Sequence, residues 1–362
     1  MINAKERKEP LIVAIGGGKG GVGKSMVCSN LAIQYASAGF RSLILDLDLG
    51  AANVHTIFGM RQPPKGLGEF FTTPDSRLRD FIIDTDIENL RIIAGGCFVP
   101  ELANLPHLQK VKVINQIKTL DADLVLLDLG AGTSSHVVDF FSICHAGIVV
   151  TTPEPTAIIN AYEFLKNIIY RILLRMFSRH PQILQLIQGS SSPGRGSKQG
   201  TIDGLIDQIE KVSPFSAQNI RDVCSDFDFH LILNQGRKVS ETQLGVKLRD
   251  LSKQFLSLNL TFEGMIFHNE EVSASIFKMT PVTIAYPDSV TSKTLKRLAI
   301  ATFHRMANKM LEIPTKENDA ENHLQQVLAH AQADYNENLI AQKRLYRARE
   351  RATEETSAAS KS

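Results

Sequence analysis

The most constraining feature of the sequence is a glycine-rich segment near its start, GGGKGGVGKS at residues 16–25. An apolar run at residues 11–15 precedes it, and the residues after it predict a helix over 25–38. This strand, turn and helix, with the spacing Gly-x4-Gly-Lys-Ser, are typical of a P-loop. Glycines let backbone N–H groups surround phosphate oxygens, and the start of the helix adds further unpaired N–H groups. The segment therefore predicts a site for nucleotide phosphates.

The side chains of this segment predict how a nucleotide would be held. We expect Lys24 to reach the β- and γ-phosphates and the Ser25 hydroxyl to ligate Mg²⁺, so the predicted cofactors are ATP and Mg²⁺. The predicted nucleotide-binding residues of the segment are Gly18, Lys19, Gly20, Gly21, Val22, Gly23, Lys24, Ser25 and Met26.

Apolar runs alternate with helical patterns along most of the chain. This alternation predicts a doubly wound α/β fold, with a mostly parallel sheet and helices on both of its faces. Strands are expected at residues 11–15, 41–47, 90–94, 124–129, 147–152, 230–234 and 265–267. Helices are expected at residues 25–38, 105–120, 156–174 and 290–311.

The predicted domain organisation has one large domain with appendages. We expect a flexible lead-in at 1–10, a P-loop domain at 11–313 with an insertion at about 172–228, and a polar helical tail at 314–362 with a disordered end. Residues 189–200 have the composition of a flexible linker. In the tail a narrow apolar stripe recurs at helical spacing, at Leu324, Leu328, Ala331, Tyr335 and Leu339.

Composition limits the partners and the compartment. The formal net charge of the 362 residues is +2, so contact with DNA or an acidic membrane would need a local patch. The four cysteines lack C-x-x-C spacing and the start is too polar for a secretion signal, which predicts reduced thiols in the cytoplasm. The tail lacks the wide apolar face of a membrane-surface helix, so a solvated or coiled-coil-like helix is favoured over a membrane or nucleic-acid contact.

Acidic residues follow two of the predicted strands. Asp46 and Asp48 come at the end of the second strand, and Asp128 follows the apolar residues 124–127. An acid at the end of a strand beside a P-loop is placed to hold the Mg²⁺ shell or to orient the attacking water. Two aspartates that only solvate a loop are the plain alternative for the first pair.

Three segments resemble the ParA/MinD superfamily of deviant Walker A ATPases. Lys19 gives the P-loop its second lysine, DLDLGAAN at 46–53 resembles the MinD-like branch, and TTPEPT at 151–156 resembles its FlhG/FleN subgroup. The resemblance implies that Lys19 reaches across a dimer interface and that Asp48 orients the hydrolytic water. It also implies that Asp46 and Asp128 support the Mg²⁺ shell with Ser25, and that Asn234 contacts adenine.

The sequence departs from that family pattern at two positions. The family commonly has an aspartate where His55 stands, and an acidic residue where Asn269 stands at the nucleotide rim. The resemblance nevertheless implies a cytoplasmic ATPase that forms a homodimer on binding ATP, with Lys19, Lys24 and Asp48 in hydrolysis. A partner protein would stimulate slow hydrolysis, and the switch would control the position or number of a polar structure such as flagella. A cell pole or the inner membrane surface is the expected place of action.

Two alternatives remain open. A ParA-type DNA-segregation ATPase would require a basic dimer surface and steep salt sensitivity. An iron–sulfur scaffold or electron donor would use Cys97, but no second cysteine lies shortly after Asp128, and a lone buried thiol is the ordinary interpretation.

Overall fold

A single twisted sheet organises the chain. The computed structural model describes residues 9–95, 106–190, 201–310 and 319–359. Within these residues the sheet has eight strands in the order β3-β4-β2-β5-β1-β6-β7-β8. All neighbouring strands are parallel except β3 and β4. The strands are β1 (Leu11–Gly16), β2 (Ser42–Leu47), β3 (Ile83–Asp84), β4 (Leu90–Ile93), β5 (Leu124–Leu129), β6 (Ala146–Thr151), β7 (Phe229–Gly236) and β8 (Leu260–Phe267).

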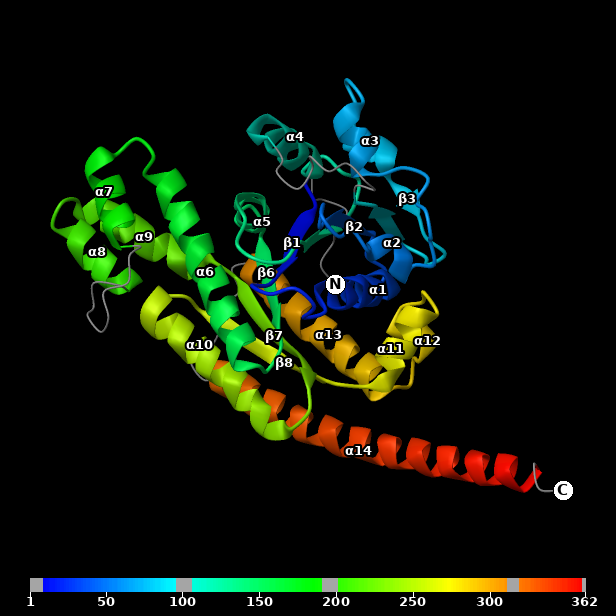
Figure 1. Cartoon of the computed structure of the whole chain (residues 1–362). Helices are drawn as coiled ribbons and strands as arrows, with labels where there is room; N and C mark the ends of the chain where they lie inside the picture. The colour runs from blue at the N-terminus through cyan, green and yellow to red at the C-terminus, as the bar shows by residue number, and fades with distance from the viewer. Residues whose placement is uncertain (1–8, 96–105, 191–200, 311–318, 360–362) are drawn as a thin grey trace.

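Helices cover both faces of this sheet (Figure 1). Those before the middle of the chain are α1 (Lys24–Ser37), α2 (Val54–Ile57), α3 (Leu67–Thr72), α4 (His107–Ile117), α5 (Ser135–Phe141) and α6 (Pro155–Met176). The later ones are α7 (Pro181–Ser190), α8 (Ile202–Glu210), α9 (Pro214–Asp226), α10 (Thr242–Leu256), α11 (Glu270–Phe277), α12 (Val282–Ala285), α13 (Val290–Met310) and α14 (Asp319–Ala359). Two 3₁₀ turns, η2 (Leu78–Phe81) and η5 (Val239–Glu241), complete the described elements.

The period of two along each strand divides the core into two layers. On β1, Ile12 and Ala14 pack with the layer that includes α4, α5, α6 and α10. Val13 and Ile15 pack with the layer of α1, α12 and α13. Because helices cover both faces, every residue of β1, β2, β5 and β6 is buried. The predicted doubly wound α/β fold is confirmed.

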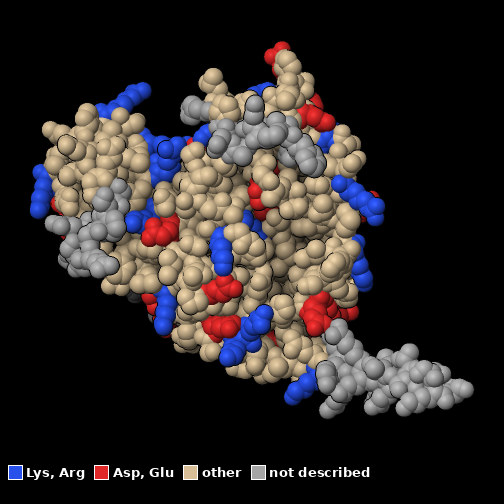
Figure 2. Space-filling view, viewed as in Figure 1, with Lys and Arg blue, Asp and Glu red and all other residues tan. Residues whose placement is uncertain are grey.

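The insertion is more ordered than its composition suggests. Helices α7, α8 and α9 form a lobe beside α6, and Ile187, Leu205 and Ile220 join the core of the main layer. Figure 2 shows a hollow between this lobe and the body, with basic side chains gathered in it. The expected linker lies mostly at residues 191–200, outside the described residues. Helices α5, α10 and α11 are present in the structure and were not among the helices expected from the sequence.

The tail helix α14 begins as part of the body and ends as a projection (Figure 1). Its buried positions are Val327, Ala331, Asp334 and Asn338, a stripe that changes from apolar to polar along the helix. Leu339, expected on the stripe, is 36% exposed. The first half of the helix therefore packs against β8, where the sequence predicts a solvated or coiled-coil-like helix. The boundary of the ATPase domain at residue 313 stays a prediction.

No helix among the described residues is both long enough and apolar enough to cross a membrane.

Candidate functional site

The predicted site residues meet at the carboxyl ends of the central strands. The P-loop lies between β1 and α1, and β2 and β5 end beside it. The strand order reverses at β1, because β2 to β5 lie on one side of it and β6 to β8 lie on the other. In open α/β sheets the crevice at such a point is where ligands bind.

Two glycines show why the P-loop tolerates no side chain. A Cβ on Gly18 would lie 2.0 Å from the backbone oxygen of Asn160 in α6. Gly23 has a φ of 90°, and a Cβ there would lie 2.2 Å from Nδ2 of Asn234. The loop is thus pressed against α6 on one side and β7 on the other, and it needs glycine for space and for a left-handed backbone.

The start of α1 is prepared for an anion. Its first residue is Lys24, whose side chain is buried, and no side chain caps the helix at Gly23. The first turn holds no acidic residue. The unpaired N–H groups and the positive end of the helix dipole are therefore available to a phosphate, with the Lys24 ammonium beside them.

Two carboxylates lie side by side in the floor of the site. Asp46 on β2 and Asp128 on β5 are paired in register and are 0% and 1% exposed. Burial, and then the charge of Asp128, raise the pKa of Asp46 well above its usual range. Burial also raises the pKa of Asp128 to about 7, although the Ser25 hydroxyl and the Lys24 ammonium lower it. The pair is short of positive charge.

The hydrogen bonds of the two acids differ. The Asp46 oxygens accept from the backbone N–H of Asp48 at 3.2 Å and of Val54 at 3.1 Å. Asp46 therefore holds the backbone of the loop after β2 in place. Neither Asp128 oxygen meets the distance and angle criteria for a hydrogen bond within the described residues. The Ser25 hydroxyl nonetheless lowers the pKa of Asp128.

This arrangement fits a magnesium ion. Mg²⁺ takes oxygen ligands and is usually held by one or two carboxylates together with substrate phosphates. The unpartnered oxygens of Asp128 and the hydroxyl of Ser25 supply such ligands beside the phosphate-binding loop. Asp46 lies one strand away and contributes charge. The assignment of Ser25, Asp46 and Asp128 to the metal stays a prediction.

Asp48 is half-buried, whereas Asp46 and Asp128 are buried. Asp48 belongs to the loop after β2, and a Cβ on Gly130 would lie 3.1 Å from its Oδ1. Two loops that follow neighbouring strands thus meet at this carboxylate. Glycine at position 130 leaves room for it, which is consistent with the predicted role near a water but does not test it.

Lys19 is held by a partner within the same chain. Its Nζ lies 2.7 Å from Oε2 of Glu154, and the side chains are 40% and 60% exposed. Glu154 immediately precedes α6 and belongs to the TTPEPT segment. The second lysine of the loop therefore lies at the surface, joined by an exposed ion pair to the segment that marks the FlhG-like resemblance.

β7 holds the P-loop from the other side. The Asn234 amide donates to the backbone oxygen of Val22 at 2.9 Å, and the Gln235 amide donates to that of Gly21 at 3.1 Å. The contact of Asn234 with adenine stays a prediction, and its bond to the loop is a finding of the structure. Gln235, near the end of β7 and with a φ of 62°, was missed, because no motif in the sequence marks it.

The two departures from the family pattern have structural settings. His55 is buried in α2, and burial lowers its pKa. The Asn269 side chain accepts from the backbone N–H of Glu271 at 2.8 Å and so caps α11. It also donates to Oδ1 of Asn338 in α14 at 3.4 Å.

The cysteines add nothing to the site as described. Cys28 and Cys224 are buried, and Cys97, on which the iron–sulfur alternative depends, lies outside the described residues.

Comparisons with known proteins agree with this geometry. Residues 9–173 match the ParA family model, described as NUBPL iron-transfer P-loop NTPase. The antiactivator FleN of Pseudomonas aeruginosa is 26% identical over 290 residues, which cover 80% of this chain and 84% of FleN. The flagellum site-determining protein YlxH of Helicobacter pylori is 28% identical over 42% of this chain and about half, 52%, of its own length.

A solved structure shows the same fold. The septum site-determining protein MinD of Pyrococcus horikoshii, complexed with Mg-ADP, has a TM-score of 0.56 at 18% identity, and the match covers 83% of this chain and 98% of that one. Residues 9–173, with the P-loop between β1 and α1 and its second lysine, therefore match the ParA/MinD type of P-loop NTPase.

Proposed function

We propose that this protein is an ATP-dependent switch of the MinD/FlhG type, which dimerises when it binds ATP and separates after hydrolysis to ADP and phosphate. The observation that carries the proposal is the combination of a buried Lys24 beside an under-neutralised acid pair and an exposed Lys19 on the same loop. The buried lysine suits phosphate binding within one chain. The exposed lysine is held by a surface ion pair, so it can be given up to a second chain.

Each residue has a role in this proposal. The P-loop backbone and Lys24 bind the phosphates, and Ser25 and Asp128 hold the Mg²⁺ with support from Asp46. The metal neutralises charge on the phosphates when it is bound. Asp48 orients the water for hydrolysis from its position next to Gly130. Asn234 positions the loop through its bond to Val22 and would contact the adenine base.

The ion pair of Lys19 with Glu154 belongs to the unassembled chain. An exposed pair of this kind contributes only about 0–1 kcal/mol, so the second chain's nucleotide can compete for the lysine. Dimerisation then replaces a carboxylate partner with phosphate oxygens. The release of Glu154 changes the start of α6, which provides a signal that a partner protein can read.

The relatives suggest the cellular role. FleN is named an antiactivator and YlxH a flagellum site-determining protein. We propose that this protein likewise acts in the cytoplasm, at a cell pole or the inner face of the membrane, to set the position or number of flagella. A partner protein would stimulate its slow hydrolysis.

Light scattering of the Asp48→Ala variant with Mg·ATP and with Mg·ADP tests the switch. We expect a dimer with ATP and a monomer with ADP, whereas the wild-type dimer decays as ATP is consumed. Lys19→Ala is the matched control, because it should bind ATP and remain a monomer. An unchanged mass of Asp48→Ala with ATP contradicts the dimerising switch. A wild-type hydrolysis rate in Asp48→Ala contradicts the role of that carboxylate.

A further inference from the structure

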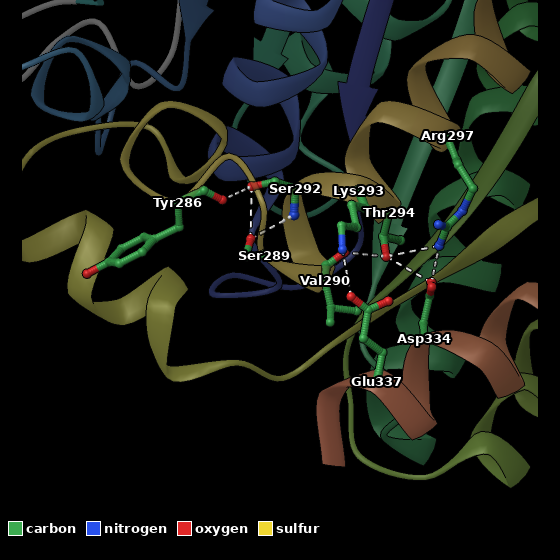
Figure 3. Close-up of polar contacts among 9 residues, drawn as sticks. All are labelled: Tyr286, Ser289, Val290, Ser292, Lys293, Thr294, Arg297, Asp334 and Glu337. Atoms are coloured by element: carbon green, nitrogen blue, oxygen red, sulfur yellow. Dashed lines mark hydrogen bonds and ion pairs between the residues drawn. The ribbon is translucent and has the colours of Figure 1, made fainter. Parts of the chain in front are cut away.

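Polar side chains attach the docked half of α14 to α13. Figure 3 shows Lys293, Thr294 and Arg297 of α13 facing α14. Thr294 donates to Asp334 at 2.8 Å, Arg297 pairs with the same carboxylate, and Lys293 lies 2.7 Å from Glu337. Among the described residues, apolar contact with the core is made by Leu324, Val327, Ala331 and Tyr335. The docked half of α14 therefore joins the body through both polar and apolar contacts.

Asn338 connects α14 to the segment after β8. Its Nδ2 donates to the backbone oxygen of His268 at 3.2 Å, and its Oδ1 accepts from Nδ2 of Asn269 at 3.4 Å. Asn269 in turn caps α11 through the N–H of Glu271. Asn338 is 6% exposed and Asn269 8% exposed, so water does not replace these bonds without a rearrangement.

The same segment is bonded to the strand that holds the P-loop. The backbone N–H of His268 donates to the oxygen of Gly236 at 2.8 Å, at the end of β7. The two residues before Gly236 are Asn234 and Gln235, whose amides hold the backbone oxygens of Val22 and Gly21. A continuous path of hydrogen bonds and short backbone steps therefore runs from α14 to the phosphate-binding loop.

We propose that Asn338 is a positioning residue of the nucleotide site, and that the docking of α14 and the binding of nucleotide are coupled through it. Docked α14 fixes residues 268–269, these fix the end of β7, and the end of β7 fixes the P-loop. The coupling is reciprocal, because any effect of α14 on nucleotide affinity requires an equal effect of nucleotide on α14. This inference rests on the proposed nucleotide-binding function.

The affinity of the full-length chain for Mg·ADP, measured by calorimetry, tests the first half of the coupling. Asn338→Ala should weaken binding about three- to tenfold, the size expected for the loss of one net hydrogen bond. In steady-state hydrolysis the KM for ATP should rise while kcat stays the same, because Asn338 does not touch the reacting atoms. Glu337→Gln is the matched control: it loses a contact of α14 with α13 outside the path, so its affinity should stay within about twofold.

Hydrogen exchange of residues 323–340 tests the second half. Saturating Mg·ADP should slow exchange there in the wild type and in Glu337→Gln, and should have no effect in Asn338→Ala. If Asn338→Ala releases α14 altogether, Gln235→Asn replaces it as the variant. Asparagine accepts the left-handed backbone at that position but is one methylene shorter, so it breaks the path far from α14.

Two results overturn the inference: equal ADP affinity of Asn338→Ala and the wild type, or equal weakening by Asn338→Ala and Glu337→Gln. A wild type that binds no nucleotide overturns the proposed function instead.

Discussion

Two sets of buried carboxylates in this protein have opposite electrostatic settings. At the carboxyl ends of β2 and β5, Asp46 and Asp128 face each other, and burial raises the pKa of both. In the middle of β8, burial also opposes the charge of Glu263, but the His230, His323 and Arg305 side chains overcome it and lower the pKa of Glu263 to about 2. The pair of Asp46 and Asp128 has too few cationic side chains around it, whereas Glu263 has enough to neutralise its charge.

Distances explain the second setting. Oε1 of Glu263 lies 2.8 Å from Nδ1 of His230 and 3.2 Å from Nε of Arg305, and Oε2 lies 3.2 Å from Nε2 of His323. These partners come from β7, α13 and α14, so the carboxylate joins three elements. Asp228 helps to raise the pKa of His230 to about 9 despite its burial.

Glu263 stabilises the fold, whereas Asp46 and Asp128 have the electrostatic setting of acids that bind a cation. Glu263 is neutralised by cationic side chains of its own chain. Asp128 lacks such neutralisation, and a divalent cation would supply the missing positive charge. A raised carboxylate pKa in a crevice is thus the stronger indication of function.

The largest stability effect should come from Glu263→Gln. Removing the charge leaves the buried His230 with Asp228 alone and the half-buried Arg305 without its carboxylate, and the free energy of unfolding should fall by about 3–5 kcal/mol. Urea unfolding measures the change. Glu337→Gln, which breaks an exposed pair on α14, is the control and should cost less than about 1 kcal/mol. Equal losses in the two variants would mean that the buried network contributes no more than a surface pair.

Asp128→Asn should have the opposite sign. The amide removes a charge that the unliganded fold buries at a cost, so we expect the free energy of unfolding without ligand to rise by about 1–3 kcal/mol. The same change should abolish most of the additional stability that Mg·ADP gives the wild type, because a metal ligand is lost. Thermal unfolding with and without Mg·ADP measures both effects. A less stable unliganded variant would contradict the electrostatic difference between the two sites.

Stability without ligand should be greatest near pH 4 to 4.5 and should fall by about 1 kcal/mol per pH unit on either side of this range. Folding lowers the pKa of Glu263 from 4.5, so its contribution is lost as the pH falls through that value toward 2. Folding raises the pKa of His230 from 6.5 to about 9, so its contribution is lost as the pH rises between these values. Burial raises the pKa of Asp128 from 3.8 to about 7, which also lowers stability as the pH rises toward 7.

Urea unfolding at a series of pH values separates the two causes of the loss of stability as the pH rises. Asp128→Asn should remove the decrease in the free energy of unfolding between pH 4 and 7 and leave the decrease between pH 7 and 9. A variant profile with the same slope as the wild type below pH 7 would exclude Asp128 as its source.

The smallest stability effect should come from the exposed pair of Lys19 and Glu154. Glu154→Gln should change the free energy of unfolding by less than about 1 kcal/mol. Because it frees Lys19, it should favour the ATP-dependent dimer about two- to fivefold while ADP affinity is unchanged. Sedimentation velocity of Asp48→Ala, with and without the added Glu154→Gln change, measures the difference. A weaker dimer would show that Glu154 supports assembly rather than competing with it.

The sequence by itself determined the sheet, the P-loop and the acids at the strand ends. These features depend on local pattern: apolar runs buried on both faces, glycine spacing, and an acid directly after a strand. The family resemblance came from the same short segments. Residues 11–15, 124–129 and the helix after the P-loop were therefore located within a residue or two of β1, β5 and α1.

Only the tertiary structure decided what depends on contacts between distant residues. Gln235 and Asn338 carry no local signal, yet they lie on the path from α14 to the P-loop. The buried stripe of α14 includes Asp334 and Asn338, which hydropathy assigns to solvent. Their burial is acceptable because Arg297, Thr294 and His268 satisfy them, and such pairing exists only after β8, α13 and α14 have come together.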